Sequence, residues 1–239
     1  MPIDSTVTQP LTSQAILALV AALGLSSTAG LRAVATLFAI GAVSDLKING
    51  SPLLVLNGGF KVLGDWRMLT LLGVLTVVEI IVDKFPGLDH VNDIIHTVIR
   101  PVVGAVIVAG TANSLSDTNV WVAAAVGAAL AFGVHATKST TRAATTAATA
   151  GVGNPVLSTG EDLLAVIAIL LVVAGKAVAI SISPWLGFAL LVLVIILALS
   201  LVYAAWRITL GVVGLFRGSQ SKPAAQASAV GAAPRGVND

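Results

Sequence analysis

The sequence predicts an all-α protein that crosses a membrane several times, and three observations lead to this fold class. Apolar residues make up 56% of the 239 residues, and only 10% are charged. The mean hydropathy is +0.99. Soluble domains carry about 25% charged residues, so a chain of this composition could not cover its core with polar surface. The third observation is a set of six long apolar stretches separated by short polar breaks.

The overall charge and the cysteine content exclude several classes of protein. A net charge of +2 provides no basic surface for nucleic acid. The absence of cysteine excludes disulfides, thiolate nucleophiles and cysteine-ligated metals. Catalytic motifs such as GxSxG, HExxH, the P-loop and the dinucleotide fingerprint are also absent. We therefore expect neither an enzyme nor a cofactor.

Six helices are predicted because a membrane-crossing helix needs about 20 mostly apolar residues. The predicted spans cover residues 14–43, 67–84, 93–111, 119–150, 162–182 and 184–215. Tryptophan favours the headgroup level of a membrane, and the tryptophans lie near predicted span ends, at Trp66, Trp121, Trp185 and Trp206.

The domain organisation follows from the same pattern. We expect a polar arm over residues 1–13, one transmembrane domain over 14–215 and a disordered tail over 216–239, which is rich in Ala, Ser, Gly and Pro. With six crossings both termini lie on the same side, and the Lys and Arg distribution slightly favours the cytoplasmic side.

The two halves of the domain contain similar sequence segments in the same order. The first contains GLSSTAGLR, from Gly24 to Arg32, and the second contains GVHATKSTTR, from Gly133 to Arg142. This predicts a 3+3 inverted repeat, residues 14–111 and 119–215, with long, interrupted first and fourth spans. Such a plan is typical of secondary transporters. The alternative is that small residues match by chance and only permit close helix packing.

Basic side chains occur inside two predicted spans, where ionisable groups are costly and usually have a partner or face a cavity. Arg32 lies in the middle of the first span. His135, Lys138 and Arg142 are spaced three and four apart, so they share one helix face. Fixed cations among Ser and Thr hydroxyls suit an anion or a polar solute. Alternatively, they are neutralised by carboxylates, for which the candidates are Glu79, Asp83 and Glu161.

An acidic hairpin connects the second and third spans. Glu79 and Asp83 share a face, and a stripe follows on the next helix, consisting of Asp89, Asp93, His96 and Arg100. The stripe could carry protons or solute, or ligate a divalent metal. Alternatively it marks a helix start, with Asp89 or Asn92 as N-cap and Arg100 paired with Glu79.

Helix breakers are concentrated in the stretch GVGNPVLSTGED, residues 151–162. Asn154-Pro155 favours a turn, and Ser158 or Thr159 ahead of Glu161 is typical of a capped helix start. A re-entrant loop lining a cavity would use the same residues, and in that case Asn154 would contact a solute.

Three of these segments are similar to those of a known family. The strings LDHVNDIIHTVIRP and HATKSTTRAATTAATAGVGNPVLSTGED, with the early GLSSTAGLR, resemble bacterial integral membrane proteins grouped as domain of unknown function 4126. The likeness covers residues 14–215 and implies a multi-pass helical protein of the inner (cytoplasmic) membrane. It implies no activity.

The first functional hypothesis is a transporter or channel for a small polar or anionic solute, coupled to protons. The residues expected to contact the solute are Arg32, His135, Lys138, Arg142 and Asn154. Those expected to relay or pair charge are Glu79, Asp83, Asp89, Asp93, His96, Arg100 and Glu161. The second hypothesis is a non-transporting assembly or lipid-binding protein whose buried charges are structural. A third is a metal-dependent membrane enzyme centred on Asp89, His90, Asp93 and His96. The expected partners are the lipid bilayer, the solute and further copies of the chain.

Overall fold

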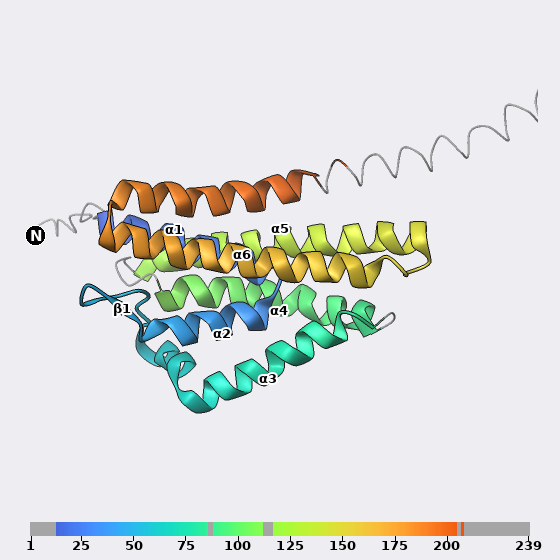
Figure 1. Cartoon of the computed structure of the whole chain (residues 1–239), viewed down its shortest axis with the longest axis horizontal. Helices are drawn as coiled ribbons and strands as arrows, with labels where there is room; N and C mark the ends of the chain where they lie inside the picture. The colour runs from blue at the N-terminus through green and yellow to red at the C-terminus, as the bar shows by residue number, and fades with distance from the viewer. Residues whose placement is uncertain (1–12, 86–87, 112–116, 205–206, 208–239) are drawn as a thin grey trace, which may run out of the picture.

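The chain folds into a bundle of helices, seen here in a computed structural model that describes residues 13–85, 88–111, 117–204 and 207 (Figure 1). Four helices are long and apolar enough to cross a membrane: Val91–Thr111, Asn119–Thr149, Asn154–Ser181 and Pro184–Ala204. This confirms an all-α membrane protein. The predicted spans over residues 14–43 and 67–84 contain shorter helices, and the predicted arm and tail lie outside the described residues.

The first predicted span is interrupted, as expected, and its two parts form a helical hairpin. Helix α1 covers Ser13–Ala29 and helix α2 covers Ala33–Ser44. In Figure 1, α1 enters the bundle from one end and α2 runs back towards that end. With 17 residues, α1 is about 25 Å long, which is shorter than the hydrocarbon core of about 30 Å. The hairpin turn, residues 30–32, therefore lies inside the bundle.

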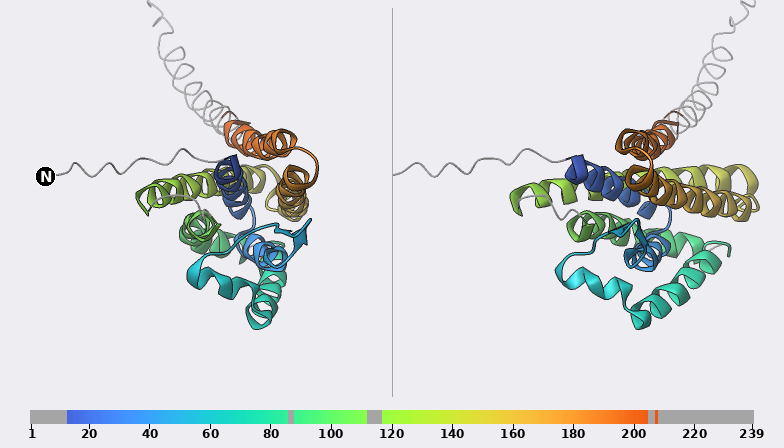
Figure 2. Two further views of the ribbon diagram at one scale, coloured as in Figure 1. Left: turned by 90° about the vertical axis from the view of Figure 1, so that its left-hand side faces the viewer. Right: turned by 60° about the vertical axis from the view of Figure 1, so that its left-hand side comes forward.

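Helix α1 occupies the centre of the molecule. Figure 2 shows it surrounded by the other helices, and it contacts α4, Leu88–Thr111, α5, Asp117–Thr149, and α6, Asn154–Ser181. The start of α1 and the end of the helix Pro184–Ala204 lie at opposite ends of the bundle (Figure 1). Both termini lie outside the described residues, and the expectation that they share one side stays a prediction.

A compact connection joins the hairpin to the next helix. Strands β1, Lys47–Ile48, and β2, Ser51–Pro52, form a small antiparallel pair. Asn49 and Gly50 between them have φ of 51° and 78°, as the two central positions of a type I′ turn require. A 3₁₀ helix, η1, Gly58–Gly64, follows.

Helix α3, Trp66–Val82, begins with a side-chain cap and ends at the acidic hairpin. The Asp65 carboxylate accepts a hydrogen bond of 2.9 Å from the backbone N–H of Arg67, which satisfies one of the free donors at the helix start. Apolar side chains such as Val74 and Val77 are exposed along α3, as expected for a surface in contact with lipid.

Helix α5 is more continuous than the sequence predicted, and helix α6 begins earlier in the chain. Helix α5 is continuous through residues 133–142, so the predicted interruption of the fourth span is wrong. Helix α6 begins at Asn154, with Pro155 in its first turn, where proline costs no hydrogen bond. The expected caps Ser158 and Thr159 therefore lie inside the helix. A tight turn through Gly151, with φ of 87°, connects α5 to α6 in place of a re-entrant loop over residues 151–162.

The closest helix packing joins α4 to α5 through small residues. A Cβ atom added at Gly127 would lie 2.7 Å from the carbonyl oxygen of Gly104 and 2.6 Å from Val108. Close approach through small residues is how membrane helices gain van der Waals contact in the absence of a hydrophobic driving force.

We predict that Gly127→Ala destabilises the protein by about 1–3 kcal/mol, the usual range for overpacking a tight contact. Gly133→Ala on the same helix is the matched control, because an added Cβ there meets only Val202 at 3.6 Å. Thermal unfolding in detergent measures both. Equal melting temperatures for the two variants would contradict the packing argument.

Candidate functional site

The turn between α1 and α2 places backbone polar groups in the interior, and charged side chains satisfy them. The N–H of Ala33, at the start of α2, donates to Oε1 of Glu79 at 3.2 Å. The carbonyl oxygen of Gly30 accepts from Nη1 of Arg100 at 3.0 Å. Across the turn, the hydroxyls of Thr28 and Thr36 are 3.1 Å apart. Non-helical backbone at membrane depth is tolerated only with partners of this kind.

Arg32, which ends the turn, is buried. Its side chain extends to the C-terminal end of α3 and to the N-terminal part of α6. It forms ion pairs with Asp83 and Asp162. Its Nη2 also donates to the Ser158 hydroxyl at 3.2 Å, and its Nη1 to the backbone carbonyl oxygen of Glu79 at 3.4 Å. That carbonyl belongs to the last turn of α3, the negative end of a helix dipole, which favours a cation.

Asp83 is fully buried and is the point where cations from two directions meet. Its Oδ2 accepts from Nζ of Lys138 at 2.6 Å and from Nη2 of Arg142 at 3.1 Å, in addition to the ion pair with Arg32. Its Oδ1 accepts from the Asn92 amide at 2.6 Å. One carboxylate thus joins α3 to the hairpin, α4 and α5.

A second carboxylate ties α5 to α6. The Arg142 guanidinium binds both carboxylate oxygens of Glu161. Its Nη2 donates to Oε2 at 2.7 Å and its Nε to Oε1 at 3.4 Å. Nζ of Lys138 lies 3.4 Å from the same Oε2. Bidentate arginine–carboxylate pairs are among the strongest and most directional in proteins, so this end of the two helices is held in one geometry.

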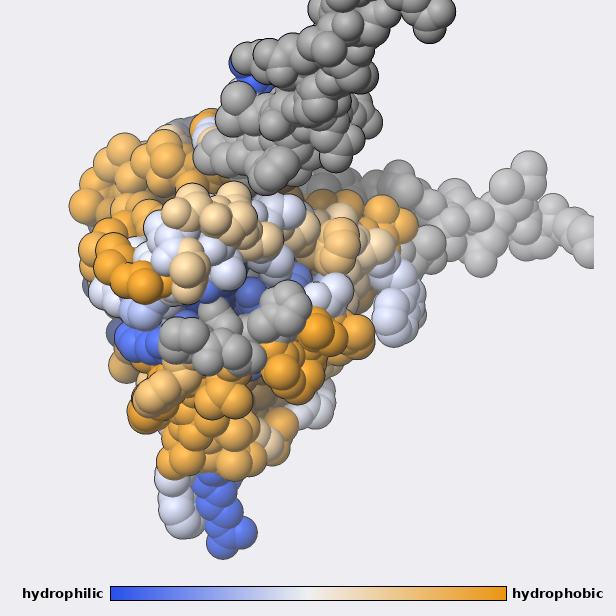
Figure 3. Space-filling view, turned by 90° about the vertical axis from the view of Figure 1, so that its right-hand side faces the viewer, coloured by the Kyte–Doolittle hydropathy of each residue, from blue (hydrophilic) through white to orange (hydrophobic). Residues whose placement is uncertain are grey.

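One pair lies closer to the surface than the rest. Nζ of Lys84 is 2.5 Å from Oδ2 of Asp162, and the two side chains are 36% and 19% exposed. Figure 3 views the end of the molecule where α5 joins α6, and hydrophilic surface is visible there between two hydrophobic regions. The Lys84–Asp162 pair is therefore less buried than the charges that it adjoins.

The charges between α3, α4 and α5 are much more loosely arranged. Glu79 Oε1 lies 3.9 Å from both Nη2 of Arg100 and Nε2 of His96. Asp93 Oδ2 lies 3.9 Å from Nη1 of Arg142. These separations are too long for direct hydrogen bonds and match the spacing at which a water or a solute atom bridges two groups.

Several buried polar atoms in this loose part have no hydrogen-bond partner among the described residues: Glu79 Oε2, Asp93 Oδ1, His96 Nδ1, Arg100 Nε and Nη2, and Arg142 Nη1. They include donors and acceptors. A buried polar group without a partner costs about 1–3 kcal/mol, so these atoms are the candidate contacts for a bound polar molecule.

His135 supports Arg100 rather than facing a cavity. Its Nδ1 is 2.6 Å from Nη1 of Arg100, and its Nε2 is 3.0 Å from the Thr97 hydroxyl. A guanidinium can only donate, so Nδ1 accepts and the ring is neutral with its proton on Nε2. We therefore assign His135 a positioning role.

The buried charges balance. We use the term ion network for the buried side chains with four cations, Arg32, Arg100, Lys138 and Arg142, and four carboxylates, Glu79, Asp83, Asp93 and Glu161. The half-buried Lys84–Asp162 pair adds one charge of each sign. A buried charge is tolerated when paired, and this set is neutral as a whole when every group is ionised.

The structure brings most of the sequence-predicted site residues together. The predicted cations Arg32, Lys138 and Arg142 meet, but their partners are carboxylates of the chain. Asn154 starts α6, and its amide donates to the Thr146 hydroxyl at 2.9 Å. Neither Asp89 nor Asn92 is the N-cap, because α4 begins at Leu88. The side chain of Asp89 lies outside those described.

Sequence reasoning missed Ser158, Asp162 and Lys84. Ser158 is expected as a helix cap and Asp162 as the first residue of a span, although their spacing of four places them on one helix face. Lys84 follows Asp83 directly, and at a helix end neighbouring residues can face different partners. Within the described part of the chain, no three His, Asp or Glu side chains are arranged to hold a metal ion.

Comparison with known proteins agrees with the segments singled out in the sequence. A family model described as Domain of unknown function (DUF4126) matches residues 19–204. The chain has no significant match among curated proteins or among solved structures. The matched range includes every described residue of the ion network.

We predict that Asp83→Asn destabilises the protein by about 3–5 kcal/mol, because it leaves buried cations without their shared carboxylate. Asp45→Asn, at an exposed aspartate, is the matched control. Combining Asp83→Asn with Lys138→Met removes one charge of each sign and should restore part of the loss. Unfolding in detergent measures all three, and equal stability of the two single variants would show that Asp83 does not hold the network together.

Proposed function

The chain belongs to the DUF4126 family, and we propose that it is a transporter of a small polar solute whose binding position is the loose part of the ion network. The observation that carries this proposal is the set of unpartnered buried donors and acceptors at the tip of a helical hairpin. Ionisable groups at membrane depth most often mark solute pathways or proton relays.

The hairpin of α1 and α2 supports the proposal. Discontinuous helices that end in the interior of a membrane protein supply free backbone groups and side chains to a site near the midplane. In this chain the turn brings Arg32 to the network and exposes the carbonyl of Gly30 to Arg100. We propose that the hairpin is re-entrant and that α3 is a fifth crossing.

The inverted repeat predicted from the sequence remains a proposal. Arg32 and Arg142 occupy matched positions in the two halves, and both bind Asp83, as pseudo-symmetric halves meeting at a central site would require. The continuous α5 differs from the broken α1–α2 segment, so any repeat has diverged at the turn.

Charge balance restricts the solute. Because the ion network is neutral, an anion that enters alone leaves a net charge in an apolar bundle, which is costly. A neutral polar solute, or an anion accompanied by a proton, preserves neutrality. Asp93 and Glu79 are the groups to accept such a proton, since each has an oxygen without a partner among the described residues.

We predict that wild-type protein in liposomes loaded with a pH-sensitive dye moves protons when a gradient of acetate, chloride or inorganic phosphate is applied. Asp93→Asn removes the proton acceptor and should lower that flux about 100-fold, as does the loss of a proton-transferring group in enzymes. Asp65→Asn, which changes an aspartate outside the network, should leave the flux unchanged. Glycerol and urea, followed by light scattering, probe neutral solutes.

Two outcomes would overturn the transport proposal. One is wild-type liposomes that are no more permeable than protein-free liposomes to each of these five solutes. The other is an Asp93→Asn variant that elutes as a folded protein and transports like the wild type.

The second candidate function is that of a non-transporting membrane protein, in which the buried charges have a structural role. It is favoured by the tight part of the network, where Asp83 accepts hydrogen bonds from four side chains. On this view the ion pairs fix helix register, and the interior contains no path for water.

Water access distinguishes the two candidates, and the chain suits the measurement because it contains no cysteine. Transport predicts that Ser158→Cys, next to Arg32, reacts with a water-soluble methanethiosulfonate reagent added to liposomes. Val108→Cys, equally buried but in an apolar contact, is the unreactive control. If both variants are equally inert, the structural role is correct.

A further inference from the structure

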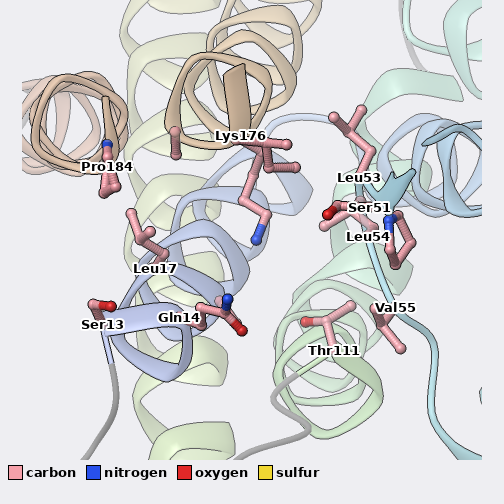
Figure 4. A pocket seen from close by; sticks show the side chains of 14 residues that line it. Ser13, Gln14, Leu17, Ser51, Leu53, Leu54, Val55, Thr111, Lys176 and Pro184 are labelled. Atoms are coloured by element: carbon pink, nitrogen blue, oxygen red, sulfur yellow. The ribbon is translucent and has the colours of Figure 1, made fainter. Parts of the chain in front are cut away.

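A second site lies at the opposite end of the bundle from the ion network. A cavity of about 510 Å³ is bounded by the start of α1, the segment around β2 and the ends of α4 and α6 (Figure 4). The ion network lies at the end of α3 and the starts of α4 and α6. The polar residues that line the cavity are Ser13, Gln14, Ser51, Thr111 and Lys176.

Lys176 gives the cavity a positive charge. Figure 4 shows its ammonium group directed into the space between α1 and β2. Among the described residues, the cavity lining contains no carboxylate and Lys176 forms no ion pair. A cation inside an apolar helix is costly without a counter-charge, and the hydroxyls of Ser13 and Ser51 add hydrogen-bond donors. The cavity therefore has the chemistry of an oxyanion site.

An apolar groove continues from this cavity. It shares Ser13, Leu17 and Pro184 with the cavity and is otherwise lined by Ile16, Trp185 and Phe188. The Trp185 side chain is 82% exposed, and tryptophan at a helix start favours the headgroup level of the membrane. The polar cavity thus lies beside the headgroup level and leads into a surface suited to hydrocarbon.

We propose that this cavity binds the phosphate headgroup of an anionic membrane lipid, with an acyl chain lying along the groove. Lys176 supplies the counter-charge, and the surrounding hydroxyls donate to the phosphate oxygens. A free phosphate ion shares the headgroup chemistry, but it leaves the adjoining groove of Ile16, Trp185 and Phe188 unused. The continuity of a charged cavity with an apolar groove is therefore the reason to assign a lipid.

The test is lipid binding to full-length protein in a neutral detergent, followed by thermal stabilisation and native mass spectrometry. Phosphatidylglycerol is the anionic probe, phosphatidylcholine the zwitterionic one, and inorganic phosphate the free anion. Lys176→Gln should weaken phosphatidylglycerol binding about fivefold, the typical contribution of one basic residue to anionic lipid binding. Lys47→Gln, an exposed lysine outside the cavity, is the charge-matched control, and Lys176→Arg should retain binding.

Trp185→Ala separates a lipid from a free anion. It shortens the groove without touching the charge, so it should weaken phosphatidylglycerol binding and leave binding of inorganic phosphate unchanged. The proposal is wrong if Lys176→Gln and Lys47→Gln bind phosphatidylglycerol equally well. It is also wrong if Trp185→Ala has no effect on the lipid, because the cavity is then a site for small anions alone.

Discussion

The turn between α1 and α2 ends two helices in the middle of an apolar bundle, and each helix end leaves backbone groups without partners. Water satisfies such groups at a protein surface, but in the interior of a membrane protein the chain must do so itself. Glu79 accepts from the first N–H of α2, and Arg100 donates to the carbonyl of Gly30. The charges nearest the turn are therefore required by the backbone path.

Each of these charged side chains in turn requires a counter-charge. Glu79 and Arg100 lie on different helices and face each other at 3.9 Å, so neither is fully compensated by its partner. Arg32, carried inwards by the same turn, needs an anion and finds Asp83. That carboxylate attracts cations from α5, and Arg142 extends the network to α6 through Glu161. Because breaking a buried pair costs more than its formation gains, the set is most stable as a whole.

The sequence predicted the long helices and the stripe on α5 well, because both depend on local pattern. The spacing of His135, Lys138 and Arg142 places them on one face of any helix. In the structure Lys138 and Arg142 meet carboxylates of neighbouring helices, whereas His135 contacts Arg100. The alternative that carboxylates of the chain neutralise these cations agrees with the structure, in which Asp83 and Glu161 are their partners. The choice among these partners depends on tertiary packing, which a single sequence does not specify.

The hairpin could not be predicted from local pattern. Residues 14–43 are apolar on all sides, so their periodicity gives no direction and a single long span fits them equally well. The segment GLSSTAGLR indicates an interruption of the span, but it does not indicate that the chain reverses there. The turn is selected by contacts distant in sequence: a Cβ at Gly30 would lie 2.5 Å from the carbonyl oxygen of Ala131, so the chain passes where only glycine fits.

Neutrality of the network also explains why its two parts differ in tightness. The pairs around Asp83 and Glu161 are direct, with distances of 2.6 Å and 2.7 Å, and hold three helices in register. The pairs around Glu79 and Asp93 are 3.9 Å apart and leave donors and acceptors that have no partner in the described part of the chain. A solute can enter only where protein pairs are not already closed, because replacing a direct buried pair exposes both of its charges. In the proposed transport, exchange of the solute is therefore confined to the region beside the hairpin turn, and the tight pairs keep that region in place.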